Sequence, residues 1–370
     1  MGASKRSIGG LYLPPRLALR GEGSPGPCKS ATSAAGKGAA MKNLLTDVPG
    51  LKVGNAEDAR VATGTTAVVF DAPAAAGVAV PGGAPALRDT GLLAPEMTVA
   101  RVDAFVLSGG SVFGLDAPGG AIAWLHAHGR GLAVGAARAP IVPGAALFDL
   151  DNGGDKAWGR RPPYFDLGWA AAETAGLDFR LGSVGAGCGA TTCDLKGGLG
   201  SASAVSSKGF VVGALAAVNA VGRATRGDAP RFWAAAYERG DEFGGLGEGA
   251  PSDDALVFAL KRDEPANTTL AVVATNAPLD KAQATRLATM ATAGFALALR
   301  PAHAPTDGDV VFAASTARAN RAPDLRDLAE IGALAAECLA RAIARGVYEA
   351  TPLPFKGAMT SWKGKWGNRH

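Results

Sequence analysis

The sequence predicts a mixed α/β (α+β) protein in which helices cover a sheet of buried strands. Short apolar runs alternate with helix-like stretches along most of the chain. Hydrophobic residues make up 48% of the 370 positions and charged residues 19%, which is typical of a folded chain. Glycine occurs 52 times, so we expect closely packed backbones and many turns.

The first forty residues differ in composition from the rest. Residues 1–40 are rich in Gly, Ser, Pro and Ala, and they hold six basic residues against Glu22 alone. Three interpretations are open: a disordered arm, an organellar transit peptide, or codons upstream of a later start. We favour the last, because structured sequence begins at Met41. We therefore expect a single domain over 41–370 and a dispensable extension before it.

Strands are expected where apolar runs are short and bounded by turn residues. The charged, glycine-rich stretch 223–266 interrupts the pattern and predicts a mobile linker, with a short strand or helix at 255–261. The expected strands are 65–70, 76–80, 103–108, 209–222, 268–278 and 309–316.

Three stretches predict helices from their periodicity and their caps. The segment 108–131 is expected to turn and then form a helix, with Ser111 as N-cap and an end near Gly129. An amphipathic helix is expected over 279–299, and a longer one over 323–346. The long helix should have Asp324 as its cap. Its expected apolar stripe is Leu325, Leu328, Ile331, Ala335, Cys338, Leu339 and Ile343.

Composition and charge exclude several classes of function. Residues 1–40 carry a net charge of +5, which leaves −1 for the rest of the chain, so no nucleic-acid partner is expected. Four cysteines and four histidines are scattered, so we expect no disulfide framework, no metal and no cofactor. The sequence holds no run of 18 apolar residues and no secretory h-region. We therefore expect no membrane association and a cytoplasmic location.

Two common catalytic motifs are not matched. The segment 182–190, GSVGAGCGA, lacks both the G-K-[ST] ending of a phosphate loop and the G-x-G-x-x-G spacing. We interpret it as a glycine-rich connection whose backbone approaches a pocket. No G-x-S-x-G elbow occurs, because SGGSVFG places Ser111 at a different offset. The few histidines also offer no evident base for a serine nucleophile.

The segment EPANTTLAVVATNAP indicates another kind of nucleophile. Thr268 follows Asn267 where the expected linker meets a buried strand. If the bond between them is cut, Thr268 becomes N-terminal. Its α-amine, with an ordinary pKa of about 8, can then act as the base for its own hydroxyl. On its own, Asn-Thr-Thr is more often an ordinary boundary between a turn and a strand.

Six motifs in order extend this hypothesis over residues 48–353. They are GLKVGNAEDARVATGTTAVVF, PGGAPALRDTGLL, VDAFVLSGGSVFGLDA, GSVGAGCGA with KGGLGSAS, VGALAAVNAVG and NTTLAVVATNA. Together they resemble the L-aminopeptidase/D-esterase family, which includes β-peptidyl aminopeptidases and the nylon-oligomer hydrolase. The resemblance implies an αββα sandwich like that of N-terminal nucleophile hydrolases, with different strand connectivity. It also implies a precursor that cuts itself into 41–267 and 268–370, and homo-oligomers of the processed chain.

The resemblance implies roles for individual residues. Asn267 and Thr268 match the cleavage pair, with Thr268 as the nucleophile. Asn219, in AAVNAVG, matches an asparagine whose amide supports the oxyanion, as a tetrahedral intermediate requires. Asp307 and Asp309 match two acids that orient the nucleophile. Their i, i+2 spacing at a strand start puts both on one side, facing Thr268.

The expected substrate pocket departs from the family. In the stretch 142–153, aminopeptidase members carry a Glu that binds the substrate ammonium and a Tyr that assists the oxyanion, whereas this chain has Ala146 and Phe148. Alanine cannot pair with an amine and the phenyl ring has no hydroxyl, so an apolar amide or oligomer fits at least as well. We expect Ser111 and Phe148 in the pocket, and Lys196, near a lysine of the family, in the catalytic set.

The predicted function is a self-processing amide hydrolase or aminopeptidase that acts on small peptides or amides. The first alternative is an acyltransferase of similar fold, resembling ornithine acetyltransferases, which passes the acyl group to an amine instead of water. The second alternative is a processed but inactive binding protein.

Overall fold

The computed structural model of the chain describes residues 41–249, 253–261 and 267–367. The predictions for residues 1–40 lie outside this part. From Met41 onward the chain forms one compact unit. Among the described residues, no helix combines the length and the apolar character needed to cross a membrane.

One long strand, β2 (Thr63–Ala79), belongs to both sheets of the fold. Its first half pairs antiparallel with β1 and β4, and its second half pairs antiparallel with β11. The sequence predicts two strands here, at 65–70 and 76–80. The residues between them include 71–73, which are exposed in the structure. The structure accommodates these residues as a shift in register between Val69 and Ala74, so the strand continues.

The remaining strands extend the two sheets on either side of β2. The first sheet has the order β3-β7-β4-β2, with β1 also on β2, and the second continues β2-β11-β10-β9-β8. Only β4 with β7 and β10 with β11 are parallel pairs among these. The strands are β1 (Leu51–Asp58), β3 (Ala86–Arg88), β4 (Val102–Ser108), β7 (Gly144–Ala146), β8 (Leu199–Val205), β9 (Val211–Asn219), β10 (Thr268–Thr275) and β11 (Val310–Ser315).

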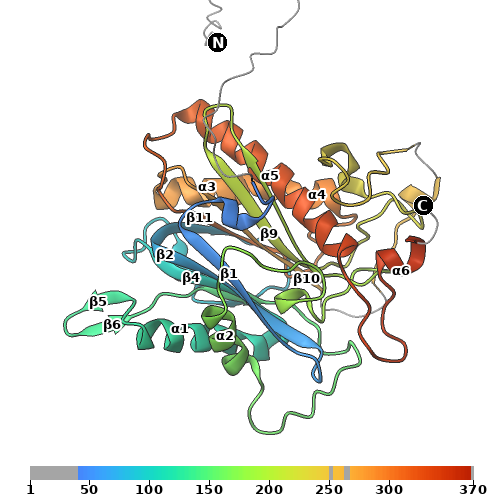
Figure 1. The fold of residues 1–370 in the computed structure, drawn as a ribbon, viewed down its shortest axis with the longest axis horizontal. Coiled ribbons are helices and arrows are strands. Elements are labelled where there is room, and N and C mark those ends of the chain that lie inside the picture. Colours follow the sequence, from blue (N-terminus) through green and yellow to red (C-terminus); the bar gives the residue numbers. More distant parts are fainter. Residues whose placement is uncertain (1–40, 250–252, 262–266, 368–370) are drawn as a thin grey trace, which may run out of the picture. The chain divides into compact units, whose positions relative to one another are not determined.

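The two sheets pack face to face and helices cover their outer faces (Figure 1). Alternate residues of β10 show the layering: Leu270 and Val272 face the first sheet, whereas Ala271 and Val273 face the helices. Both faces are covered, so β10 is a continuous apolar run in the sequence. The layers are α1 (Ala117–Ala127) and α2 (Tyr164–Glu173), the two sheets, then α3 (Lys281–Ala291), α4 (Ala293–Ala298) and α5 (Leu325–Tyr348). The predicted αββα sandwich is therefore confirmed.

Close backbone contact explains part of the high glycine content. Helices α1 and α2 cross at Gly120 and Gly168. A Cβ at Gly120 would lie 1.9 Å from the Phe165 carbonyl oxygen, and one at Gly168 would lie 1.9 Å from the Ala117 carbonyl oxygen. No side chain fits there. A hairpin of β5 (Leu132–Val134) and β6 (Ala137–Ala139) follows α1, and the short helix α6 (Trp362–Trp366) lies near the C-terminus.

The predicted helices are present, with three corrections. Ser111 is not an N-cap: it begins the 3-10 helix Ser111–Asp116 with a left-handed φ of 52°, and Asp116 is the N-cap of α1. The helix predicted at 279–299 is divided into α3 and α4. Asp324 caps α5 as predicted, accepting a bond from the Asp327 N–H, but Leu325 is 86% exposed. The stripe meets the core from Leu328, which is partly buried, and is buried from Ile331 onward.

The prediction of a mobile linker over 223–266 is wrong for much of its described part. Phe232, Ala234 and Phe243 are buried in the core beneath α5. A 3-10 helix forms at Trp233–Tyr237, and the short element expected at 255–261 is a 3-10 helix at Asp253–Leu256. The aperiodic pattern gave the wrong prediction because Phe232 and Phe243 pack against elements that are distant in the sequence.

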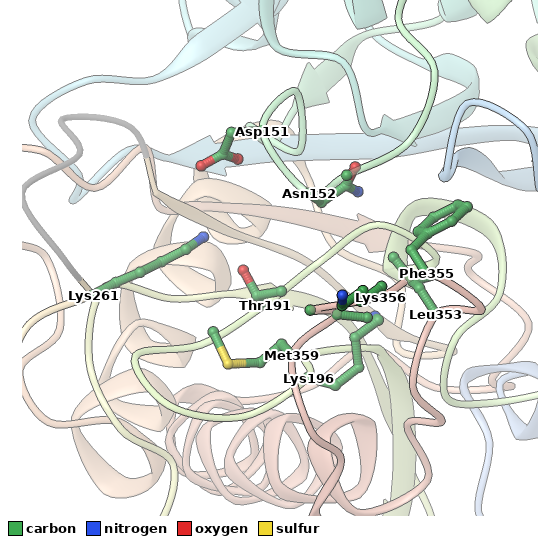
Figure 2. Close-up of a pocket in the computed structure, with 12 residues that line it drawn as sticks. Asp151, Asn152, Thr191, Lys196, Lys261, Leu353, Phe355, Lys356 and Met359 are labelled. Atoms are coloured by element: carbon green, nitrogen blue, oxygen red, sulfur yellow. The ribbon is translucent and has the colours of Figure 1, made fainter.

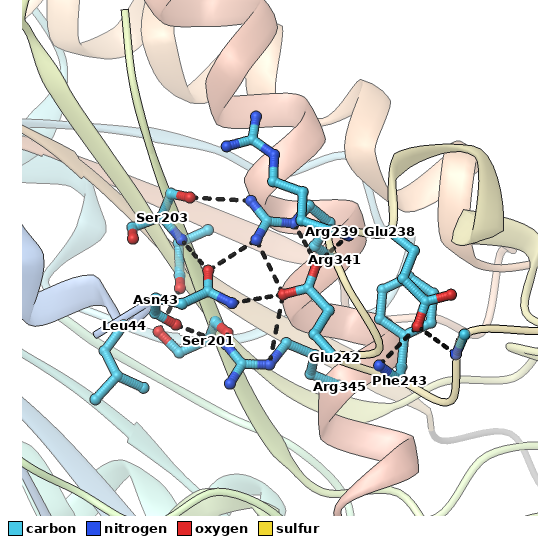
Figure 3. A network of polar contacts seen from close by, with 12 residues as sticks. Asn43, Leu44, Ser201, Ser203, Glu238, Arg239, Glu242, Phe243, Arg341 and Arg345 are labelled. Carbon is cyan, nitrogen blue, oxygen red and sulfur yellow. Dashed lines mark hydrogen bonds and ion pairs between the residues drawn. The ribbon is translucent and has the colours of Figure 1, made fainter. Parts of the chain in front are cut away.

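A buried ion pair holds this segment to α5 (Figure 3). The Arg341 guanidinium donates to both Glu242 oxygens, at 2.6 and 2.9 Å. Asn43 joins them: its Nδ2 donates to Glu242 at 2.5 Å and its Oδ1 accepts from Arg341 at 2.8 Å. Arg345, one turn further along α5, lies 3.8 Å from the same carboxylate. The network therefore joins three segments that are far apart in sequence.

Candidate active site

Thr268 is the first residue of β10, a strand that lies between β11 and β9 in the second sheet. Across the antiparallel ladder its partner is Asn219, the last residue of β9. Both residues are buried, Thr268 at 4% exposure and Asn219 at 0%. The strand pairing therefore brings together the two residues that the sequence proposes as nucleophile and oxyanion donor, although they are far apart along the chain.

The hydroxyl of Thr268 is turned toward the peptide bond that precedes it. Its Oγ1 lies 2.5 Å from the carbonyl oxygen of Asn267. The same oxygen accepts the Gly308 N–H at 2.6 Å. Gly308 is so close that a Cβ there would lie 2.4 Å from Thr268 Oγ1. This carbonyl is thus polarised by a backbone donor while a hydroxyl is held against it.

Asp307 and Asp309 flank Gly308, and both are buried. The carboxylate of Asp309 accepts the N–H of Thr269 at 2.8 Å and contacts His303 Nδ1 at 2.9 Å. Asp307 accepts N–H groups of the 221 and 304 backbone. Burial, reinforced by the neighbouring Asp309 carboxylate, raises the pKa of Asp307 to about 7. Of the bonds described for the two acids, the one from the Thr269 N–H to Asp309 lies next to the nucleophile, and none goes to the Thr268 hydroxyl.

The side chain of Asn219 is held on both sides. Its Nδ2 donates to the Phe148 carbonyl oxygen at 2.9 Å, and its Oδ1 accepts the Thr191 N–H at 2.9 Å. Lys261 Nζ lies 3.3 Å from the same Oδ1. One of the two N–H donors of the amide that the resemblance assigns to an oxyanion is therefore bonded to a backbone carbonyl in the uncut chain.

Lys196 lies beneath this site in a fully buried position. Its Nζ donates to the carbonyl oxygens of Gly187, Ala190 and Gly197 at 2.7–3.1 Å. Burial lowers the pKa of Lys196 to about 7. Three carbonyl acceptors match the three donors of an ammonium group. Lys196 therefore ties together the glycine-rich segment that leads to Thr191, and it makes no contact with Thr268 in the described structure.

A pocket of about 240 Å³ adjoins Asn219 (Figure 2). Thr191 and Lys261, which both contact Asn219, are part of its lining. The glycine-rich segment 182–190 does not itself line this pocket; the residue that follows it, Thr191, does. Ser111 and Phe148 do not line this pocket. The Ser111 N–H donates to the Leu147 carbonyl, and Phe148 contributes its carbonyl oxygen to Asn219 instead of its ring.

Three groups of the site were missed in the sequence. Gly308 supplies an N–H, and a glycine between two acids in TDGDV was the available signal. His303 contacts Asp309 from six residues away, but an isolated histidine gives no signal of its own. Lys261 reaches Asn219 from the stretch interpreted as linker. Among the described residues, no group of three or more His, Cys, Asp or Glu side chains is arranged to hold a metal ion.

A family profile and several relatives match this chain. The profile of peptidase family S58 matches residues 43–360. An uncharacterized aminopeptidase of Mycobacterium tuberculosis is 39% identical over 336 residues, covering 84% of this chain and 95% of that protein. One of Mycobacterium leprae is 37% identical over 339 residues, covering 84% and 92%. These matches do not favour the acyltransferase alternative.

Solved structures share the fold. A β-aminopeptidase of a Burkholderia species has a TM-score of 0.66 at 22% identity, covering 88% of this chain and 92% of that one. The L-aminopeptidase D-Ala-esterase/amidase of Ochrobactrum anthropi, described as a variant of the Ntn hydrolase fold, has a TM-score of 0.63 at 19% identity. That match covers 86% of this chain and 90% of that one. These similarities agree with the αββα layering described above.

Proposed function

Because the chain belongs to peptidase family S58, we propose that it cuts itself between Asn267 and Thr268 and then hydrolyses amide bonds with the freed Thr268. The observation that carries the proposal is the 2.5 Å contact between Thr268 Oγ1 and the Asn267 carbonyl oxygen. A hydroxyl held against the carbonyl before it needs little reorganisation to reach the carbonyl carbon.

Self-cleavage begins with attack of Thr268 Oγ on the carbonyl carbon of Asn267. The C–N bond then breaks, and the hydroxyl proton passes to the Thr268 nitrogen, which leaves an ester and a free α-amine. Water opens this ester, giving a carboxylate at Asn267 and restoring the Thr268 hydroxyl. The Gly308 N–H, 2.6 Å from the carbonyl oxygen, supports this route because it can stabilise the negative charge of the tetrahedral intermediate.

In the processed enzyme, the α-amine of Thr268 takes the proton from its own hydroxyl. The oxygen attacks the carbonyl of a peptide or amide substrate, and the proton passes to the departing amine. Water then releases the acyl group from Thr268. Asn219, directly across the ladder, supplies an amide donor for the oxyanion, and Asp309, bonded to the Thr269 N–H, orients the new chain end.

Two adjacent threonines provide a matched test. Thr268→Val should abolish both cleavage and hydrolysis, whereas Thr269→Val should preserve both, because the Thr269 hydroxyl has no hydrogen-bond partner among the described residues. Thr268→Ser should still cleave, more slowly. Intact-mass spectrometry should find fragments 1–267 and 268–370, which at this chain's average residue mass are about 27 and about 10 kDa. An uncut chain that hydrolyses an alanine dipeptide at full rate would refute the mechanism.

Further properties of the proposal rest on the family resemblance for the assembly and on the sequence composition for the location and the first forty residues. We expect processed chains to assemble into homo-oligomers in the cytoplasm, and a chain beginning at Met41 to fold and process normally. A light-scattering mass equal to one processed chain would contradict the assembly. Loss of processing in the shortened chain would contradict the dispensable extension, and cell fractionation tests the location.

A further inference from the structure

The pocket beside Asn219 carries an unequal set of charges. Lysines 196, 261 and 356 and a single acid, Asp151, supply the charged groups of its lining (Figure 2). Lys196 is committed to three backbone carbonyls, so it is not available to a ligand. Lys261 contacts Asn219 Oδ1 at 3.3 Å, so Lys356 is the lysine of the lining that can turn to a ligand. The lining holds three lysines and one acid, so the pocket favours a ligand with a negative charge.

Lys356 is the cation best placed for a ligand. It is an exposed residue of the loop 353–359, and it makes no ion pair with the described residues. Other exposed lysines have such partners: Lys363 pairs with Glu349 at 2.6 Å and Lys42 with Asp178 at 2.7 Å. A cation that lines a pocket without a carboxylate partner can bind a carboxylate from outside the chain.

The pocket lies next to a residue of the proposed active site. Thr191 and Lys261 belong to its lining and both contact the side chain of Asn219, which lies across the ladder from Thr268. A ligand in the pocket therefore lies one side chain away from Asn219, the residue across the ladder from Thr268. The walls also include apolar groups, Leu353, Phe355 and Met359, which lower the local dielectric and strengthen charge pairing.

We infer that this pocket selects amide substrates that carry a free carboxylate, such as short peptides with an unblocked C-terminus, and that Lys356 is the residue that recognises it. The inference rests on the proposed function, because it concerns the substrate of the same site. The α-carboxylate of a short peptide and an acidic side chain share this chemistry, and the substrates below distinguish them.

The test compares three substrates of equal length, Ala-Ala, Ala-Ala-amide and Ala-Asp-amide, by the rate at which the intact substrate disappears. The wild-type processed enzyme should hydrolyse Ala-Ala with a kcat/KM at least about threefold above that of Ala-Ala-amide, as an ion pair near the surface provides. The preference should shrink at high salt. A high rate for Ala-Asp-amide assigns the pocket to a side-chain carboxylate, whereas a low rate assigns it to the α-carboxylate.

Variants separate recognition from catalysis. Lys356→Gln should remove the preference mainly through KM and leave self-cleavage intact, whereas Lys356→Arg should retain it. Lys363→Gln, an exposed lysine on α6 outside the pocket, is the matched control and should change nothing. Asp151→Asn removes the pocket's acid and should strengthen the preference. Equal kcat/KM for the acid and the amide, in wild type and in Lys356→Gln, overturns the inference and leaves the proposed function standing. Absence of both self-cleavage and hydrolysis overturns the proposed function itself.

Discussion

Replacing Arg341 by methionine should destabilise the folded chain by about 3 kcal/mol, because it leaves a buried carboxylate without its main partner. The side chains of Arg341 and Glu242 are only 2% and 6% exposed, and two charge-assisted hydrogen bonds join them. Each such bond contributes about 1.5–3 kcal/mol. Asn43 and Arg345 remain near the carboxylate after the change, so the loss should lie at the low end of the range for a broken buried pair.

The assay is urea unfolding followed by circular dichroism. It uses the Thr268→Val background, so that the chain stays in one piece. Arg161→Met, which breaks an exposed pair with Asp166 at 3.1 Å, is the control and should cost less than about 1 kcal/mol. The double variant Arg341→Met with Glu242→Leu should recover most of the loss, because it removes both charges together. A loss below 1 kcal/mol for Arg341→Met, or a double variant weaker than the single one, would refute the reasoning.

The pH dependence gives the same prediction a second readout. Burial acts to raise the pKa of Glu242, but its bonds from Arg341 and Asn43 outweigh burial and hold that pKa below its ordinary value. A lowered carboxyl pKa contributes stability that is present above the unfolded pKa and is lost as the pH falls through the folded one. The advantage of wild type over Arg341→Met should therefore shrink toward acid pH.

Three further predictions concern the active site. Asn219→Ala should lower hydrolysis about 10²–10³-fold yet leave self-cleavage largely intact, as measured by peptide release and intact mass. Gly308→Ala should slow self-cleavage about a hundredfold, because its Cβ would lie 2.4 Å from Thr268 Oγ1, whereas Gly91→Ala has no atom within 4 Å of the new methyl group and should cleave normally. Asp307→Asn should flatten the melting-temperature profile between pH 4 and pH 7. In wild type the raised Asp307 pKa of about 7 means that the native chain keeps a proton the unfolded chain has lost, so stability falls over that interval, and a wild-type profile without this fall contradicts the assignment.

Periodicity predicted several individual strands and helices well, because each element is shaped by what lies on its own two faces, whereas the αββα layering came from the family resemblance. The run 268–278 contains β10, and 323–346 coincides with most of α5, down to the Asp324 cap. Predictions from local sequence patterns failed where a segment packs against elements that are distant in the sequence. Phe232 and Phe243 lie in an aperiodic stretch and are buried only because α5 and Trp362 cover them.

The residues of the site also fall into those that the sequence predicted and those that it did not. Thr268 was reached from a hydroxyl residue at a strand boundary, and Asn219 and the two acids from a resemblance that spans six motifs. Gly308, His303 and Lys261 act through a backbone N–H, a contact with Asp309 and a contact with Asn219. Apart from the glycine between two acids in TDGDV, these contacts leave no pattern in the sequence, because they depend on how segments that are far apart along the chain meet in space.

We propose that the two reactions use different donors. In the uncut chain the Phe148 carbonyl takes one of the two N–H donors of the Asn219 amide, whereas the Gly308 N–H is already bonded to the oxygen of the Asn267 carbonyl that self-cleavage attacks. Once Asn267 is a separate chain end it can leave Gly308, and a substrate carbonyl can then take the second donor of Asn219. In the uncut chain the site holds the peptide bond between Asn267 and Thr268, and cleavage of that bond frees the site for the amide bond of a substrate.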